Sequence, residues 1–178
     1  MIEIRWHGRG GQGAFTASKL LGAAAVSKGL SALAFPSFGP ERRGAPIQAF
    51  TKISEHPVSL PICDRSTITK CDYIVYLDET IYSPQALQDL KPGGKILMNS
   101  NNPQKYQDEN ILVLDADAIA QRILKRPVSN TAMLALLAKE SGIVSASDVR
   151  KILGEYLPER IVDKNIAVID EVTEGRQG

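Results

Sequence analysis

The sequence has few side chains that could hold a metal. Its 178 residues include two cysteines, Cys63 and Cys71, and two histidines, His7 and His56. The cysteines stand too far apart to form a Cys-x-x-Cys pair, and a zinc site or a [4Fe–4S] cluster needs about four ligands. We therefore expect no metal bound by this chain alone, and we expect both thiols to be ordinary packing residues in a reducing compartment.

An excess of one charge and long apolar runs are also missing. Lys and Arg number 21 against 20 Asp and Glu, which gives a formal net charge of +1, and the cations are scattered along the chain. This balance argues against a nucleic-acid partner. No apolar run reaches the roughly 18 residues of a membrane span, and the amino terminus lacks the form of a signal peptide. We expect no membrane contact and a cytoplasmic location.

Length and composition favour one folded unit. With 43% hydrophobic residues, a chain of this length can bury one substantial core. The sequence contains no internal repeat, low-complexity tract or interdomain linker. We therefore expect a single domain covering residues 1–178.

The most informative segment runs from Ile4 to Gly13, where a short apolar strand leads into a Gly-x-Gly-x-x-Gly turn and then a helix. In this pattern Gly8 permits a tight turn, Gly10 lets the backbone approach a ligand, and Gly13 lets the helix pack closely on the strand. The amide groups and the positive dipole end of the helix would face an anion. The candidate cofactor-binding residues are Gly8, Gly10, Gly11, Gln12 and Gly13.

The spacing of acidic residues disfavours NAD as the ligand of this turn. A dinucleotide-binding domain has an Asp or Glu about 20 residues further on, at the end of the second strand, to hold the ribose. Here the next acidic residue is Glu41, which lies beyond the expected second strand. A strand-to-helix corner without any ligand accounts for the same glycines equally well.

Apolar runs with β character alternate with helical patterns along the chain. The expected strands are Ile2–Trp6, Ser31–Phe35, Ile47–Ile53, Tyr73–Leu77, Lys95–Met98 and Ile111–Leu114. This alternation predicts a three-layer, Rossmann-like α/β fold with a mostly parallel sheet and helices on both faces. The third run alternates polar and apolar residues and could pair with Val58–Leu60 in an antiparallel hairpin around Glu55-His56-Pro57, which would make the sheet mixed.

Cap signals and periodicity place the helices. The expected helices are Ala14–Lys28, a helix from Ser83-Pro84 to Leu90, Ala116–Leu124, Thr131–Lys139, Val149–Leu153 behind a Ser145/Asp148 cap, and a last helix from Pro158 to about Val172. The helix at Thr131–Lys139 is apolar nearly all round, so it should be buried on more than one side. The carboxyl-terminal helices thus begin at about residue 131.

A second candidate site lies in the loop between the second and third expected strands. Three prolines and two glycines surround the adjacent charges Glu41, Arg42 and Arg43, and a guanidinium suits carboxylates or phosphates. A solvated charged loop is the simpler interpretation. Because this loop and the glycine turn both follow carboxyl ends of strands, we expect them at the same end of the sheet. Glu41, Arg42 and Arg43 are therefore candidates for contact with a partner or an anion.

Four segments together carry a family resemblance. They are W-H-G-R-G-G-Q-G, A-F-P-S-F-G-P-E-R-R-G-A-P, L-K-P-G-G and N-T-A-M-L. This set, spread in the same order from Ile2 to about Leu153, closely resembles the gamma subunit of pyruvate:ferredoxin oxidoreductase and of related enzymes that act on other 2-oxoacids. The gamma subunit of that family is one α/β domain, in agreement with the expected fold.

The resemblance implies a non-autonomous subunit of an enzyme complex. The complex would use thiamine diphosphate, Mg, [4Fe–4S] clusters and coenzyme A, carried with alpha, beta and delta partner subunits, and would pass electrons to ferredoxin. This chain has no G-D-G...N-N thiamine-diphosphate motif and no cluster-binding cysteine run, so we expect it to bind none of these cofactors alone and to hold no catalytic residue. The E-R-R-G-A-P version of the loop favours pyruvate or a branched-chain oxoacid over 2-oxoglutarate.

Two other interpretations remain open from the sequence. The chain could be a stand-alone nucleotide-binding protein that uses the turn from Gly8 to Gly13, which calorimetry on the isolated chain would detect. It could also be a purely structural scaffold that contacts no ligand. The scaffold differs from the gamma-subunit interpretation only in the effect of Gln12→Ala on turnover in an intact complex.

Overall fold

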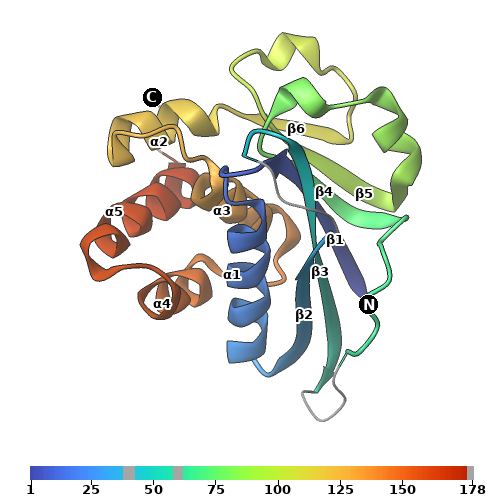
Figure 1. Cartoon of the computed structure of the whole chain (residues 1–178), viewed down its shortest axis with the longest axis horizontal. Coiled ribbons are helices and arrows are strands. Elements are labelled where there is room, and N and C mark those ends of the chain that lie inside the picture. The colour runs from blue at the N-terminus through green and yellow to red at the C-terminus, as the bar shows by residue number, and fades with distance from the viewer. Residues whose placement is uncertain (38–42, 58–61, 176–178) are drawn as a thin grey trace.

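The computed structural model describes residues 1–37, 43–57 and 62–175. Its centre is a sheet of six strands in the order β2-β3-β1-β4-β5-β6 (Figure 1). The strands are β1 (Ile2–Arg9), β2 (Leu30–Pro36), β3 (Pro46–Pro57), β4 (Cys71–Tyr76), β5 (Leu90–Asn99) and β6 (Ile111–Leu114). All six predicted strands are therefore present, several of them longer than predicted.

The sheet is mixed. Strands β1, β4, β5 and β6 are parallel to one another, whereas β3 is antiparallel to both β1 and β2. The predicted hairpin turn at 55–57 is wrong, because β3 continues to Pro57, which pairs with Leu30 of β2. Both edges of β3 are occupied by β1 and β2, and the proposed partner Val58–Leu60 lies outside the described residues.

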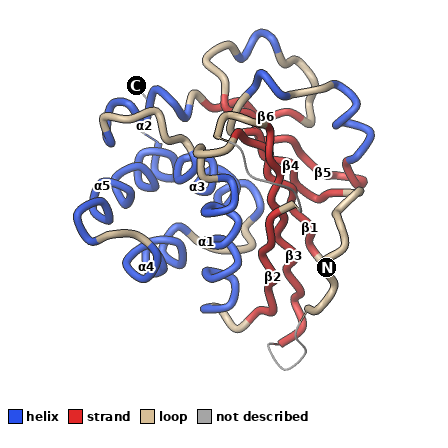
Figure 2. The backbone as a smooth tube through the Cα atoms, viewed as in Figure 1, coloured by secondary structure: helices blue, strands red, loops and turns tan. Residues whose placement is uncertain are grey.

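The two faces of the sheet are covered differently (Figures 1 and 2). The α-helices of the described chain are α1 (Ala14–Ser27), α2 (Ala116–Leu124), α3 (Asn130–Ser141), α4 (Ala146–Tyr156) and α5 (Glu159–Asp170). All of them pack on one face, and a π-helical turn, Glu171–Gly175, follows α5. The other face carries loops and three short 3-10 helices, η1 (Glu79–Ile81), η2 (Pro84–Asp89) and η3 (Pro103–Lys105). The helix predicted from Ser83-Pro84 to Leu90 is the 3-10 helix η2, which ends at Asp89, and Leu90 begins β5.

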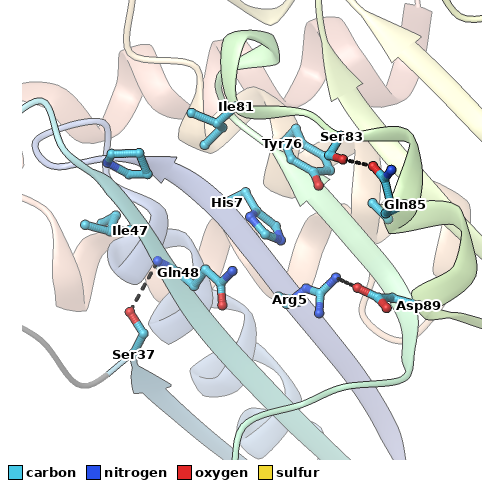
Figure 3. A pocket seen from close by; sticks show the side chains of 12 residues that line it. Arg5, His7, Ser37, Ile47, Gln48, Tyr76, Ile81, Ser83, Gln85 and Asp89 are labelled. Atoms are coloured by element: carbon cyan, nitrogen blue, oxygen red, sulfur yellow. Dashed lines mark hydrogen bonds and ion pairs between the residues drawn. The ribbon is translucent and has the colours of Figure 1, made fainter.

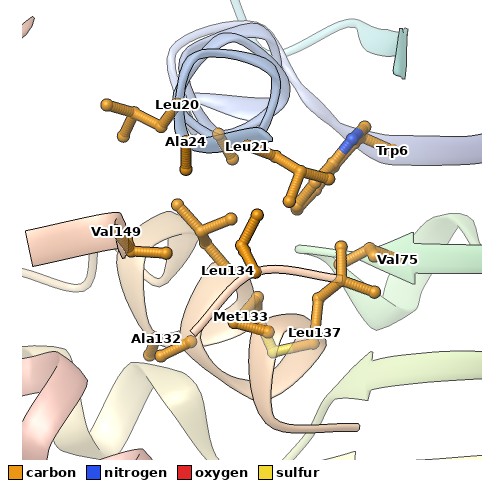
Figure 4. Close-up of a cluster of buried hydrophobic side chains, with 14 of the residues drawn as sticks. Trp6, Leu20, Leu21, Ala24, Val75, Ala132, Met133, Leu134, Leu137 and Val149 are labelled. Atoms are coloured by element: carbon orange, nitrogen blue, oxygen red, sulfur yellow. The ribbon is translucent and has the colours of Figure 1, made fainter. Parts of the chain in front are cut away.

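The main core lies between the sheet and the helices (Figure 4). Helix α3 is buried almost all round, as predicted, because it packs against α1, α5 and the sheet at once. Trp6 of β1 is fully buried there, and its indole Nε1 donates a hydrogen bond of 3.0 Å to Thr51 Oγ1 on β3. Truncating a leucine in such a core, for example Leu134, costs about 2–5 kcal/mol of the free energy of unfolding.

Alternate residues of the same strands build a second, smaller core on the other face. Ile74 and Tyr76 of β4 point there, while Val75 between them points to the helices. This period of two is the strand geometry that the sequence pattern predicts. None of the described helices has both the length and the apolar character that a bilayer crossing requires.

Candidate functional site

The glycine turn differs in detail from the predicted one. Strand β1 continues to Arg9, so Gly8 lies in the ladder opposite Ile47 and does not form the tight turn assigned to it. The turn is made at Gly11 and Gly13, whose φ angles are +96° and +84°. L-amino acids with a side chain rarely adopt this left-handed region, so these two positions require glycine. We call the segment from Gly8 to Gly13, with the start of α1, the glycine corner.

Gly13 is the point of closest approach in the glycine corner, but to α3 and not to β1 as predicted. A Cβ atom at Gly13 would lie 2.5 Å from Nδ2 of Asn130, the first residue of α3. That Nδ2 donates a long hydrogen bond of 3.4 Å to the carbonyl oxygen of Gly13. Gly13 is also the N-cap of α1 and supplies no side-chain cap, so the first amides of α1 have no side-chain acceptor.

The backbone of Gly10 contacts a segment of the same chain. Its N–H donates to the carbonyl of Ala45 at 2.9 Å, and its carbonyl accepts from Gly44 N at 3.1 Å. A parallel bridge joins Gly10 to Arg43, whose side chain is exposed. The structure therefore brings Arg43 to the glycine corner, at the end of the sheet where it was predicted. Glu41 and Arg42 lie outside the described residues.

Three side chains lock the glycine corner in place. Gln12 Oε1 accepts from Arg9 N at 2.6 Å, and Gln12 Nε2 donates to Asp78 Oδ2 at 3.1 Å. Arg9 Nε donates to the same carboxylate oxygen at 3.0 Å. Burial by itself would raise the pKa of Asp78, but hydrogen bonds from Thr80 and Gln12 and the charge of Arg9 outweigh it and lower that pKa. The carboxylate is therefore held ionised as the acceptor on which the network converges.

The role of Arg9 and Asp78 was missed in the sequence analysis. Asp78 directly follows the strand that ends near Leu77, and β4 is the parallel neighbour of β1. Asp78 is a carboxylate just after β4, and the glycine turn follows the neighbouring parallel strand β1. This position at the carboxyl end of a parallel strand is the signal that could have identified Asp78. Arg9 lies inside the glycine motif, where the glycines alone were considered.

A small acidic cavity of about 260 Å³ adjoins the glycine corner. Its lining includes four carboxylates, those of Asp78, Glu79, Asp115 and Asp117. The hydroxyl of Tyr106 donates to Glu79 at 2.7 Å and is the main cause of the lowered pKa of Glu79. Ionised carboxylates repel an anion, so the surroundings of the glycine corner are unfavourable for a phosphate on this side.

Asn99, at the end of β5, has a structural role in the same cavity. Its Oδ1 accepts from the backbone N–H groups of Ala116 and Asp117, at 3.0 Å and 3.3 Å, and so caps the start of α2. Its Nδ2 donates to the carbonyl of Leu77 at 2.9 Å. Both polar atoms of the Asn99 side chain are therefore bonded to the backbone of this chain.

A larger cavity of about 660 Å³ opens on the face of the sheet that lacks α-helices (Figure 3). His7 of β1 stacks on Tyr76 with ring centroids 4.5 Å apart, and Arg5 pairs with Asp89 at 2.5 Å. Burial, aided by the charge of Arg5, lowers the pKa of His7 from 6.5 to about 3. His7 is therefore a neutral imidazole near pH 7, so this cavity offers polar contacts without a histidine charge.

The described residues include no group of three or more His, Cys, Asp or Glu side chains placed to hold a metal ion. Cys71 is buried, and burial raises the pKa of its thiol to about 11, whereas Cys63 is exposed. With a pKa in that range, Cys71 remains a thiol at neutral pH and is a poor ligand or nucleophile.

Comparisons with known proteins agree with the geometry. The family model for pyruvate ferredoxin/flavodoxin oxidoreductase matches residues 3–175. Pyruvate synthase subunit PorC of Methanothermobacter marburgensis is 43% identical over 166 residues, which cover 93% of this chain and 92% of the relative. The common gamma subunit of the pyruvate/ketoisovalerate oxidoreductases of Thermococcus kodakarensis is 37% identical over 179 residues, with 96% and 95% covered.

A solved structure extends the similarity to the whole fold. The crystal structure of pyruvate oxidoreductase subunit PORC from Thermotoga maritima is similar with a TM-score of 0.82 and 34% identity. The match covers 97% of this chain and 95% of that chain. A similar overall fold therefore occurs in a chain of similar length and sequence.

Proposed function

The chain belongs to the pyruvate ferredoxin/flavodoxin oxidoreductase family, and from this premise we propose that it is the gamma subunit of a 2-oxoacid:ferredoxin oxidoreductase. In this role it is one part of a multisubunit enzyme that oxidatively decarboxylates a 2-oxoacid, forms an acyl-CoA and passes the electrons to ferredoxin. The chain supports this reaction as a non-autonomous subunit and performs no chemical step by itself.

The observation that carries this proposal is similarity over the full length to other subunits. The family model spans residues 3–175, and the relatives of 43% and 37% identity are both named as subunits. Those subunits match this chain over most of their length, with 92% and 95% covered. A chain that is similar over its whole length to a subunit is expected to have the role of a subunit.

We propose that the cofactors of the complex are held by its other chains, that these chains are alpha, beta and delta subunits, and that the complex lies in the cytoplasm. A [4Fe–4S] cluster needs about four thiolates, and this sequence has two cysteines, of which Cys71 is buried. The residues present therefore do not fit a cluster. Thiamine diphosphate and Mg are likewise placed on the partners, and coenzyme A in the complex as a whole.

The glycine corner is proposed to face a partner subunit. Hydrogen bonds among Arg9, Gln12 and Asp78 hold the glycine corner in one conformation. The loss of conformational entropy on binding a partner is therefore small. The uncapped first turn of α1 can donate backbone N–H groups, and the exposed Arg43 can pair with a partner carboxylate. A nucleotide site at the same turn is disfavoured, because the Gly10 backbone and the Gln12 side chain already have partners within the chain.

Substrate choice is proposed to lie in the partner subunits. The relative from Thermococcus kodakarensis is named as a subunit common to pyruvate and ketoisovalerate oxidoreductases. One gamma chain that serves two oxoacids cannot be what selects between them. We expect pyruvate or a branched-chain oxoacid as the substrate of the complex, in line with the E-R-R-G-A-P segment of the loop.

Purification and omission test the proposed function. A tag on this chain should co-purify the other subunits, and the complex should reduce ferredoxin with pyruvate or a branched-chain oxoacid in the presence of coenzyme A. The isolated chain should show no turnover, and a complex assembled without it should lose most of its activity. Turnover by the isolated chain, or full activity without it, would contradict the proposal.

Variants of the charged loop test the partner contact separately. Arg43→Ala and Arg42→Ala should weaken association of this chain with the complex, because removing one partner of a desolvated charge pair costs about 2–5 kcal/mol. Arg65→Ala, at an exposed arginine between β3 and β4, is the matched control. Subunit affinity can be measured by titration of the labelled chain. Unchanged affinity in both variants would overturn the assignment of the loop while leaving the family role intact.

A further inference from the structure

A cavity of about 610 Å³ lies among the carboxyl-terminal helices. It is bordered by the segment after α2 and by the first turns of α3 and α5. Its lining residues are Leu124, Arg126, Val128, Asn130, Thr131, Leu157, Arg160, Ile161, Lys164 and Asn165. We call it the cationic cavity, for the charges that it gathers.

The charges around the cationic cavity have one sign. Arg126, Arg160 and Lys164 all line it, and no carboxylate is among the described residues of its lining. Within the described part of the chain, these three side chains form no ion pair, although ion pairs are common elsewhere on the surface. In a chain whose net charge is only +1, three unpaired cations at one concavity form a local field that attracts an anion.

The helix ends add to this field. The cavity lining includes residues of the first turns of α3 and α5, and the N-cap residues Ser129 and Pro158 make no side-chain cap. At the start of α3 the Thr131 N–H donates to Asn130 Oδ1 at 2.9 Å, so one amide of that turn already has an acceptor. The start of a helix carries a partial positive charge and amide groups without intrahelical acceptors. Arg160 lies in the first turn of α5, where a cation is unfavourable for the helix itself, whereas Glu159 in the same turn has the favourable sign. An anion between these helices would compensate both effects.

The floor of the cavity is polar and buried, and its apolar walls are half-buried. Thr131 Oγ1 donates to Asn165 Oδ1 at 2.7 Å, and Asn165 Nδ2 donates to the carbonyl of Ile161 at 2.8 Å. Both polar side chains are at least nine-tenths buried, so their positions are fixed by the fold. Apolar walls stand beside them, formed by Leu124, Val128, Leu157 and Ile161. The cavity thus offers a rigid polar floor, apolar walls and a cationic rim.

We propose that the cationic cavity binds an organic phosphate of about the size of a mononucleotide. Two guanidinium groups match the geometry of phosphate oxygens, and the ammonium of Lys164 adds a point charge. The apolar walls suit a base or another flat apolar group, and the volume lies within the range of about 300–1,000 Å³ typical of small-molecule sites. The inference rests on the residues of this chain alone and is independent of the partner contacts proposed above.

Calorimetry with AMP on the full-length chain tests this inference. AMP should bind more tightly than inorganic phosphate and more tightly than adenosine, because it engages both the cations and the apolar walls. Arg160→Ala and Lys164→Ala should each weaken AMP binding about tenfold or more, as expected when a charge-assisted hydrogen bond is lost. Arg65→Ala, at an exposed arginine between β3 and β4, should change the affinity less than about twofold.

Amide chemical shifts locate the site without any substitution. Addition of AMP should shift the backbone signals of Asn130, Thr131 and Asn165, and should leave those of Gly10 to Gln12 unchanged. No binding at millimolar AMP, equal losses in the cavity variants and the control, or shifts confined to the glycine corner would overturn the proposal. Equal affinity for AMP and inorganic phosphate would overturn the assignment to an organic phosphate.

Discussion

The glycine corner and the cationic cavity are two candidate anion sites of this chain, and they differ in sequence motif and in charge. The glycine corner has the expected glycines, but its Gln12 and Gly10 are bonded within the chain and four carboxylates line the adjoining cavity. The cationic cavity has no recognisable sequence motif, yet three cations and two helix starts converge on it. A motif indicates a backbone path, whereas the charges that decide binding come from segments far apart in the sequence.

The two regions meet at one contact. Asn130, at the start of α3, lines the cationic cavity and also touches Gly13 in the glycine corner. The glycine corner therefore contacts the helical layer at Gly13, where its backbone packs most closely against another segment. Substitutions at this contact and on either side of it should separate what each region contributes to the fold.

The largest expected effect is that of Gly13→Ala. A Cβ atom at this position would lie 2.5 Å from Asn130 Nδ2, and the residue has a φ of +84°. Both the clash and the left-handed backbone conformation therefore oppose the substitution. We expect the free energy of unfolding to fall by about 2–4 kcal/mol in urea titrations. Gly11→Ala is the matched control, because its φ is +96° but nothing lies within 4 Å of the added atom. It should cost about 1–2 kcal/mol, and equal losses for both variants would rule out the clash.

A smaller effect is expected for Asp78→Asn. Loss of the charged acceptor of Arg9 and Gln12 should lower the free energy of unfolding by about 1–2 kcal/mol at pH 7. Because the folded pKa of Asp78 is lowered, the unfolded chain binds more protons in acid, and this stabilisation is present at neutral pH and lost as the pH falls through the acid range.

The pH dependence of stability provides the check for Asp78. The difference in unfolding free energy between the wild type and Asp78→Asn should shrink as the pH falls from 7 towards 3, measured by urea titration at each pH. Asp163→Asn, at an exposed carboxylate of α5, should show a difference near zero throughout. If the difference in unfolding free energy between the wild type and Asp78→Asn stayed constant over this pH range, the proposed role of the Asp78 charge would be contradicted.

The smallest effect, with the opposite sign, is expected in the cationic cavity. Arg160→Gln removes an unpaired cation from the first turn of α5 and should leave stability unchanged or raise it by up to about 0.5 kcal/mol. Arg150→Gln is the contrast in the same helical layer, because Arg150 Nε donates to Asp170 at 2.8 Å. It should lower stability by about 0.5–1 kcal/mol. A clear loss of stability in Arg160→Gln would mean that this cation serves the fold and not a ligand.

The local elements of the fold could be predicted from the sequence. Strand Ile111–Leu114 and helix Ala116–Leu124 have the predicted bounds, and Ser145 and Asp148 form the predicted capping box. Each of these features depends on neighbours within a few residues, on periodicity or on a cap. The partners of β3 were missed, because strand pairing is decided across the sheet and the alternating pattern fits a hairpin and a central antiparallel strand equally well.

The sequence alone determined the α/β class, the family resemblance and the placement of glycines at a turn, because these follow from residue types and short spacings. Only the tertiary structure decided what that turn touches. Asn130 reaches Gly13 across 117 residues, and Asp78 reaches Arg9 across 69. The cationic cavity likewise exists only because three helices converge. Charge and hydrogen-bond complementarity act through space, so they become visible only when the chain has brought distant residues together.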